Sequence, residues 1–208
     1  MKTTYKTGWL KRLLAVLCAC LTALMLAGCS LMGLADKVGD MLSGKTGYEK
    51  DGLTYRLSED GTYYSLVDCE EGVNEANILA EIDGVPVTTI ASDTFINNRQ
   101  SWGIHKITIP NSVTTLEDNA ISQCYYLLEL VIPDSVTYIG KNAFYHCRAL
   151  RSITIGSGVQ TIGAYAFHNC WDLKTVNYTG TSEAWAKIQI GDGNHYLTDL
   201  EVNFITAE

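Results

Sequence analysis

Three consecutive segments of 23 residues, between positions 105 and 173, carry the same pattern of apolar side chains. The columns that line up at this spacing are Ile109, Ile132 and Ile155; Val113, Val136 and Val159; Leu116, Ile139 and Ile162; Ala120, Ala143 and Ala166; Ile121, Phe144 and Phe167; Cys124, Cys147 and Cys170; and Leu127, Leu150 and Leu173. A period of about 20–29 residues with apolar columns is typical of a solenoid, in which each repeat forms one turn. A single turn cannot bury its own apolar face, so neighbouring turns must stack into a continuous core.

Each regular repeat is expected to begin with a short strand, and these strands fall at 106–109, 129–132 and 152–155. Pro110 and Pro133 end the first two, because proline cannot continue a hydrogen-bond ladder. Stacking the strands in parallel creates one inward column, which consists of Ile107, Leu130, Ile153 and Val176. We therefore predict a β-rich, right-handed solenoid of short parallel strands with 23-residue repeats.

A different pattern precedes the regular repeats. Apolar residues alternate at 53–57 and again at 64–66, with turn residues at 58–61 between them, which predicts a β-hairpin. A looser repeat follows, in which Val87, Ile90 and Phe95 precede their counterparts in the next unit by slightly more than one regular period. End repeats of solenoids are atypical because they shield the core from water. We predict an N-terminal cap at 49–78 and the solenoid at 79–208.

The fourth repeat predicts a divergent C-terminal cap. It keeps Val176 and Tyr178 in the strand columns and then departs from the pattern between 180 and 191. We expect Trp185 to cover the open end of the stack, and a last strand to form at 200–204. Such a cover is needed because the final turn would otherwise expose its apolar surface.

The segment 1–28 has the composition of a secretory signal. Its basic residues are Lys2, Lys6, Lys11 and Arg12. The apolar run at 13–26 is too short for a stable membrane span. Leu-Ala-Gly-Cys at 26–29 resembles the lipobox of bacterial lipoproteins, which implies cleavage before Cys29 and a diacylglyceryl group on its sulfur; an ordinary signal cleaved nearby is the alternative. Residues 29–48 are expected to be the lipidated Cys and a tether, with a short amphipathic helix as the alternative to a flexible segment.

The charge of the chain excludes one class of partner. Without residues 1–28 the sequence has 11 Lys and Arg against 23 Asp and Glu, a formal net charge of −12. Such a surface repels phosphate backbones, so nucleic-acid binding is not expected. It gives no electrostatic attraction to anionic lipid either, so membrane attachment would depend on the lipid on Cys29.

The repeat resembles a known family. Val-x-x-Ile-Gly-x-x-Ala-Phe-x-x-Cys-x-x-Leu, at 136–150 and 159–173, is similar to the BspA-type leucine-rich repeat of bacterial surface proteins. The segments at 82–90 and 175–181 resemble that family's opening and closing segments, and the resemblance covers 49–205. It implies an exported, cell-surface protein that binds other macromolecules, and it brings no shared catalytic residues. The departures are Ile121 in place of Phe, Glu117 in place of Gly, and the degenerate fourth repeat.

Few side chains are placed for catalysis or metal binding. Cys124, Cys147 and Cys170 lie too far apart in sequence for a zinc knuckle. In turns about 5 Å apart they would stack as buried thiols or, alternatively, form a disulfide, and Cys69 is expected to be a lone thiol. His105, His146, His168 and His195 are each expected to be exposed loop residues. The acidic cluster at 68–75 lacks calcium-loop spacing. No nucleophile motif appears, so we predict a protein that is not an enzyme and needs no cofactor or metal.

Recognition must use the outward positions, because the inward columns form the core. The column after the cysteines holds Tyr125, Arg148 and Trp171, where Arg148 would lie between two aromatic rings. The adjoining strand positions are Glu129, Val131, Ser152 and Thr154. We predict a lipid-anchored bacterial surface protein, on the extracellular or periplasmic face, whose repeat surface binds a protein or glycan ligand, including recognition of host or matrix proteins or adhesion. The alternatives are an aromatic column that only shields the edge, and an envelope scaffold or accessory subunit of a cell-wall or transport system.

Overall fold

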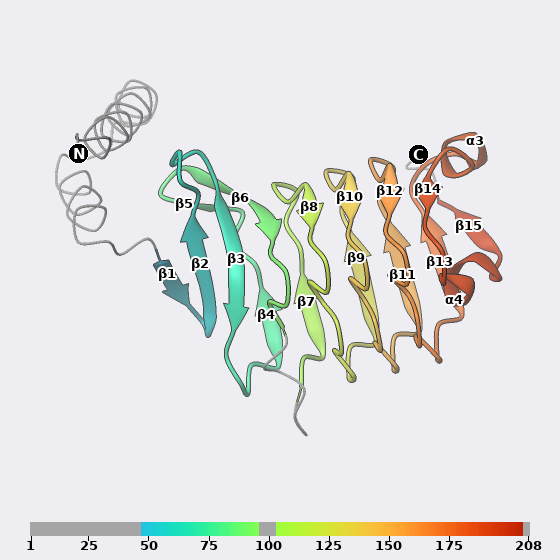
Figure 1. The fold of residues 1–208 in the computed structure, drawn as a ribbon, viewed down its shortest axis with the longest axis horizontal. Coiled ribbons are helices and arrows are strands. Elements are labelled where there is room, and N and C mark those ends of the chain that lie inside the picture. The colour runs from blue at the N-terminus through green and yellow to red at the C-terminus, as the bar shows by residue number, and fades with distance from the viewer. Residues whose placement is uncertain (1–46, 96–102, 206–208) are drawn as a thin grey trace, which may run out of the picture.

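The turns of the molecule stand side by side in one row, from β1 (Gly47–Lys50) at the N-terminal end to the last turn, with β15 (Val202–Phe204), at the C-terminal end (Figure 1). The computed structural model describes residues 47–95 and 103–205. In the regular part, strand pairing joins residues at the 23-residue spacing of the repeat, as Ile153 joins Leu130 and Val176. This confirms the predicted β-rich solenoid with 23-residue repeats. The predicted signal at 1–28, Cys29 and the tether up to residue 46 lie outside the described residues.

The regular turns form two parallel ladders of short strands. The strands of the first are β9 (Glu129–Ile132), β11 (Ser152–Ile155) and β13 (Thr175–Tyr178), and those of the second are β8 (Thr115–Leu116), β10 (Tyr138–Ile139) and β12 (Thr161–Ile162). The strand before β9, β7 (Lys106–Thr108), pairs in a separate two-stranded sheet with β4 (Glu75–Asn77). In the first ladder Ile153 lies opposite Leu130 and Val176. All three side chains are buried, which confirms these members of the inward column predicted from the repeat. The fourth predicted member, Ile107, is also buried but pairs opposite Ala76 of β4.

The apolar columns form the core. Phe144 and Phe167 are fully buried in neighbouring turns, with their ring centres 4.9 Å apart. The cysteine column also takes part in hydrogen bonding, because Cys147 Sγ donates to the Ile121 carbonyl at 3.2 Å and Cys170 Sγ to the Phe144 carbonyl at 3.3 Å. All four described cysteines are buried, and none of them is in a disulfide. The thiols of Cys147 and Cys170 therefore both fill the core and link one turn to its neighbour.

The corner after the second ladder requires left-handed backbone. Asn119, Asn142 and Tyr165 occupy equivalent positions with φ of 59°, 56° and 59°. Asparagine tolerates this conformation, whereas it strains the tyrosine. The turns also approach closely here, since a Cβ on Gly140 would lie 2.5 Å from the backbone carbon of Glu117. The glycine of the repeat is therefore explained by the contact between turns.

The N-terminal cap is an antiparallel sheet of three strands. It consists of β1 (Gly47–Lys50), β2 (Leu53–Leu57) and β3 (Tyr64–Cys69). The pair β2–β3 is the predicted hairpin. β1 includes residues 47 and 48, which were predicted to belong to the tether, because their backbone pairs with β2. β3 then pairs in parallel with β6 (Val85–Ile90), so the cap continues the second ladder.

The first turn of the solenoid begins earlier than predicted. β4 (Glu75–Asn77) pairs in parallel with β7, and Ala76 lies opposite Ile107, which is farther along the sequence than one regular period. This moves the boundary into the segment 49–78 that was predicted to be cap. The longer offset accommodates β5 (Glu81–Ile82), which pairs antiparallel with β6. Farther along this turn the offset shortens to the predicted one, with Ile90 opposite Leu116.

The C-terminal cap closes the other end of the row. It contains α3 (Ser182–Trp185), β14 (Gln189–Ile190), α4 (His195–Thr198) and β15 (Val202–Phe204). Trp185 packs on Tyr178 with ring centres 5.1 Å apart, and β15 pairs in parallel with β13, so the predicted cover and last strand are both present. Over the ranges 47–95 and 103–205, no helix is long and apolar enough to cross a membrane.

Candidate partner-binding edge

A column of three large side chains lies in the bends that lead into the strands of the first ladder. The guanidinium carbon of Arg148 lies 5.1 Å from the ring centre of Tyr125 and 4.7 Å from that of Trp171. We call these three residues the aromatic–arginine edge. The 23-residue spacing predicted this stack, and the structure has this geometry. Arg148 is exposed and Trp171 keeps 53% of its surface exposed, so the stack is accessible.

A second column, two positions earlier in each repeat, consists of Gln123, His146 and Asn169 and contacts the aromatic–arginine edge. His146 Nδ1 lies 3.3 Å from Arg148 Nε and 3.2 Å from Arg148 Nη2. Trp171 Nε1 donates to Asn169 Oδ1 at 3.3 Å. The Tyr125 hydroxyl donates to Gln123 at 2.9 Å. The stack is thus preorganised, which lowers the entropic cost of ordering these side chains when a partner binds.

The sequence did not predict the contacts of His146 with Arg148, and the predicted exposure of two histidines was wrong. His146 and His168 were predicted to be exposed loop residues, and both are half-buried, whereas His105 and His195 are exposed. His168 is surrounded by aromatic rings, with Tyr145 stacked at 5.7 Å and His195 edge-on at 5.9 Å. The signal in the sequence was the 23-residue column of Gln123, His146 and Asn169, two positions before the aromatic–arginine edge.

The contact with Arg148 requires a neutral His146, because Nδ1 can accept from the guanidinium only when it carries no proton. Burial lowers the pKa of His146, and the positive charge of Arg148 and the neighbouring His168 lower it further. A lowered pKa means that the unfolded chain binds the proton more readily than the folded one. Stability from this group is therefore present above the unfolded pKa of about 6.5 and falls as acidification protonates His146.

We expect Arg148→Met to raise the pKa of His146, because it removes the neighbouring charge while keeping an apolar side chain between the two rings. Titration of the histidine ring signals by NMR measures this shift. Arg151→Met, at an exposed cation farther along the chain, is the matched control and should leave the His146 titration unchanged. Equal titration curves in the wild type and Arg148→Met would contradict the proposed contact.

The strand face adjoins the aromatic–arginine edge along the chain. Its predicted members Glu129, Val131, Ser152 and Thr154 all point outward, and they lie pairwise opposite on β9 and β11. Glu129 and Val131 are exposed, while Ser152 and Thr154 are half-buried. Val131 is 61% exposed, which makes it an apolar side chain on an otherwise mostly polar face.

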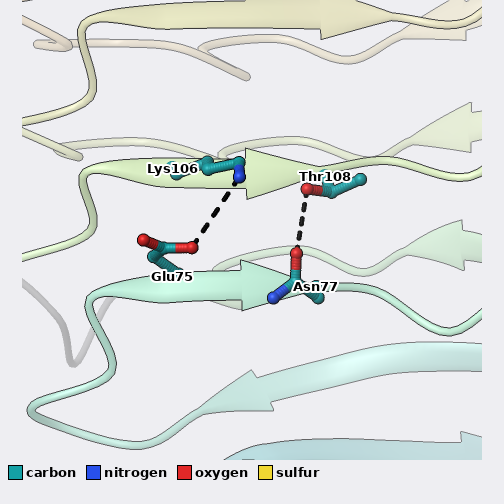
Figure 2. Close-up of polar contacts among 4 residues, drawn as sticks. All are labelled: Glu75, Asn77, Lys106 and Thr108. Carbon is teal, nitrogen blue, oxygen red and sulfur yellow. Dashed lines mark hydrogen bonds and ion pairs between the residues drawn. The ribbon is translucent and has the colours of Figure 1, made fainter.

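Polar side chains link neighbouring strands elsewhere on this face. Figure 2 shows β4 and β7, where Lys106 forms an ion pair with Glu75 at 3.8 Å and the Thr108 hydroxyl donates to Asn77 at 3.0 Å. Both side chains of the ion pair are largely exposed, so the pair adds little stability. Glu75 belongs to the acidic cluster at 68–75, and its carboxylate pairs with a lysine side chain.

The buried thiols are poor candidates for catalytic nucleophiles. The hydrogen bond with Cys147 and burial raise the pKa of Cys124 well above its usual range, and burial raises that of Cys170. A thiol with a raised pKa is rarely ionised and is a weak nucleophile. Among the residues that the structure describes, no three His, Cys, Asp or Glu side chains come together as a metal site.

Short parallel strands, 23-residue turns and buried Leu columns define the chain as a leucine-rich repeat protein. The BspA type leucine rich repeat region matches residues 81–188 in six copies, and the chain belongs to this family. Proteins of this type are typically found at the cell surface and generally bind proteins. Their solenoid is typically a non-enzymatic scaffold.

Solved structures of bacterial leucine-rich repeat proteins are similar in fold. One from Bacteroides capillosus is 26% identical, with a TM-score of 0.55, over 65% of this chain and 99% of its own. One from T. pallidum is 21% identical, with a TM-score of 0.49, over 62% and 70%. A cell surface protein from Faecalibacterium prausnitzii is 22% identical, with a TM-score of 0.48, over 70% and 42%. No curated protein matches the sequence.

Proposed function

We propose that the chain is a lipid-anchored bacterial surface protein that binds a macromolecular partner without catalysis, through the aromatic–arginine edge and the adjoining strand face. The observation that carries this proposal is the position of Arg148 between Tyr125 and the exposed Trp171. Arginine, tyrosine and tryptophan are the residues most enriched at binding hot spots. An aromatic stack that only shielded the core would not need an exposed cation at its centre.

The anchor is proposed from the sequence at 26–29, where Cys29 would carry the lipid. Two acyl chains hold a protein on a membrane where one chain binds only marginally. β1, the first described strand after the tether in the sequence, lies at one end of the row of turns (Figure 1). Its negative charge gives it no attraction to anionic lipid, so the repeat faces stay available to a partner.

Cys29→Ser is expected to release the protein from membranes into the soluble fraction, because it removes the sulfur that the lipid requires. Fractionation after washing without detergent, followed by immunoblotting, measures the distribution. Cys69→Ser serves as the control, since that thiol is buried in β3 and cannot anchor the chain. Continued membrane association of the Cys29→Ser protein would contradict lipid anchoring.

Binding is tested with the soluble fragment 30–208 as bait against host matrix proteins, glycans and envelope extracts. Arg148→Ala and Trp171→Ala should each weaken capture of the recovered partner by about tenfold or more, as expected for hot-spot residues. Lys187→Ala and Tyr138→Ala remove an exposed cation and an exposed aromatic ring elsewhere, and should leave capture unchanged. If both edge variants fold normally and bind like the wild type, the partner does not use this edge. Recovery of an envelope enzyme or transporter would favour the accessory-subunit alternative.

A further inference from the structure

Positive charge gathers beside the aromatic–arginine edge of this acidic protein. The chain carries 15 Lys and Arg against 23 Asp and Glu. Three of these cations, Arg148, Arg151 and Lys174, lie in two adjacent turns, and all three are exposed. Lys174 N donates to the Arg151 carbonyl at 3.0 Å, so these two residues are direct neighbours across the stack. We call the three residues the basic corner.

The three cations of the basic corner form no ion pair within the described part of the chain. Among residues 47–95 and 103–205, neither Arg151 nor Lys174 forms an ion pair, and the side-chain hydrogen bonds of Arg148 go to His146. Two acids lie beside the corner: Asp172 N donates to the Arg148 carbonyl at 3.2 Å, and Glu129 lies opposite Ser152, the residue after Arg151. Over the same ranges neither acid forms an ion pair with these cations. The charged groups of these three side chains therefore remain available to an anionic partner.

Exposed apolar side chains surround the same corner. Tyr126 is 39% exposed and Leu128 is 42% exposed, in the turn next to Arg151, and Trp171 and Val131 are more exposed still. Leu128 occupies the same repeat position as Arg151 and Lys174, one turn earlier. A partner that lies along this column thus contacts the apolar side chain of Leu128 and the positive charges of Arg151 and Lys174 in successive turns.

We propose that the partner presents an acidic protein segment with at least one apolar side chain, whose carboxylates meet the basic corner and whose apolar group packs on Leu128 and Tyr126. This inference rests on the proposed function and names the chemical class of its partner. Carboxylates are the group that arginine binds with two parallel hydrogen bonds. An anionic glycan would satisfy the cations, but its polar rings make less use of Leu128 and Val131, so a peptide fits the surface better.

Electrostatic attraction predicts how such a segment would bind. Its negative charge is repelled by most of the protein surface and attracted at the basic corner, which selects one docking site on a chain of net charge −8. Attraction between exposed charges is screened by salt, so the affinity should fall as ionic strength rises. The apolar contact is insensitive to this screening, so part of the affinity should persist at high salt.

The experiment pans a random library of displayed dodecapeptides against the full-length chain purified in detergent. The enriched peptides should carry a net negative charge and at least one large apolar residue. Arg151→Gln together with Lys174→Gln should lower the affinity of a selected peptide about tenfold. Lys141→Gln together with Lys187→Gln removes the same charge elsewhere and should change it less than twofold. Polygalacturonate, an anionic glycan without apolar side chains, should compete poorly.

Each outcome bears on the inference. Enrichment of neutral or basic peptides, or an unchanged affinity in the Arg151→Gln, Lys174→Gln protein, would overturn it. Competition by polygalacturonate at the level of the peptide would assign the corner to an anionic glycan instead, and concentration-dependent self-association lost in the same variant would assign it to a second copy of the acidic chain. If Arg148→Ala and Trp171→Ala abolish partner capture while the double Gln variant does not, the edge is correct and the acidic segment is wrong. If none of these variants affects capture, the proposed binding edge itself fails.

Discussion

Phe144→Ala is expected to lower the free energy of unfolding by about 3–5 kcal/mol. Phe144 is fully buried in the central regular turn, and its ring packs on Phe167 at 4.9 Å. Its backbone N–H donates to the Ala166 carbonyl at 2.8 Å, so the residue also links two turns. Removing the ring leaves a cavity that close-packed neighbours on both sides cannot fill without moving.

The loss should be cooperative, because each turn buries its apolar face only against its neighbours. Urea unfolding of the 30–208 fragment, followed by circular dichroism, should show a single transition at a lower midpoint with little change in slope. Tyr138→Ala removes an aromatic ring from the same turn at a position that is 40% exposed, and should cost less than about 0.5 kcal/mol. An unchanged midpoint for Phe144→Ala would show that the 23-residue register is wrong.

The regular turns could be predicted from the sequence because a fixed period converts sequence positions into spatial neighbours. Once the spacing of 23 was set, Leu130, Ile153 and Val176 had to lie in one column, and they pair in that register. The same logic placed Arg148 between Tyr125 and Trp171. Side-chain contacts between turns therefore follow from the period wherever the turn has constant length.

The strand pairing at the ends of the solenoid could not be predicted in this way, because the end turns do not keep the 23-residue period. β4 pairs with β7 so that Ala76 lies opposite Ile107, a spacing that the pairs of regular strands do not repeat. Polar partners were missed for a different reason. The role of His146 depends on the tautomer and on where the Arg148 guanidinium turns, neither of which is encoded in a pattern of apolar residues.

Asn194 shows what replaces the missing neighbour at the C-terminal end. In the regular turns, the backbone N–H of the aromatic position donates to the next turn, as Phe144 does to Ala166. The last such group, Phe167 N, has no following regular turn and donates instead to Asn194 Oδ1 at 3.0 Å. The amide of Asn194 donates to the carbonyls of Gly163 and Gly191 at 3.0 and 2.7 Å. The Asn194 side chain, which is only 3% exposed, thus accepts the hydrogen bond that the backbone of a further regular turn would accept.

Asn194→Ala should therefore lower the free energy of unfolding by about 2–4 kcal/mol, because it leaves buried backbone groups without partners at a cost of roughly 1–3 kcal/mol each. Hydrogen exchange measured by NMR should locate the loss at the Phe167 amide, which would exchange much faster than the equivalent Phe144 amide. Asn203→Ala is the matched control, since Asn203 is exposed and its amide donates only to Asn177 on the strand face at 3.2 Å. If the two alanine variants unfold at the same urea concentration, or if the Phe167 amide stays protected without Asn194, then the α3–α4 segment closes the stack by apolar packing alone.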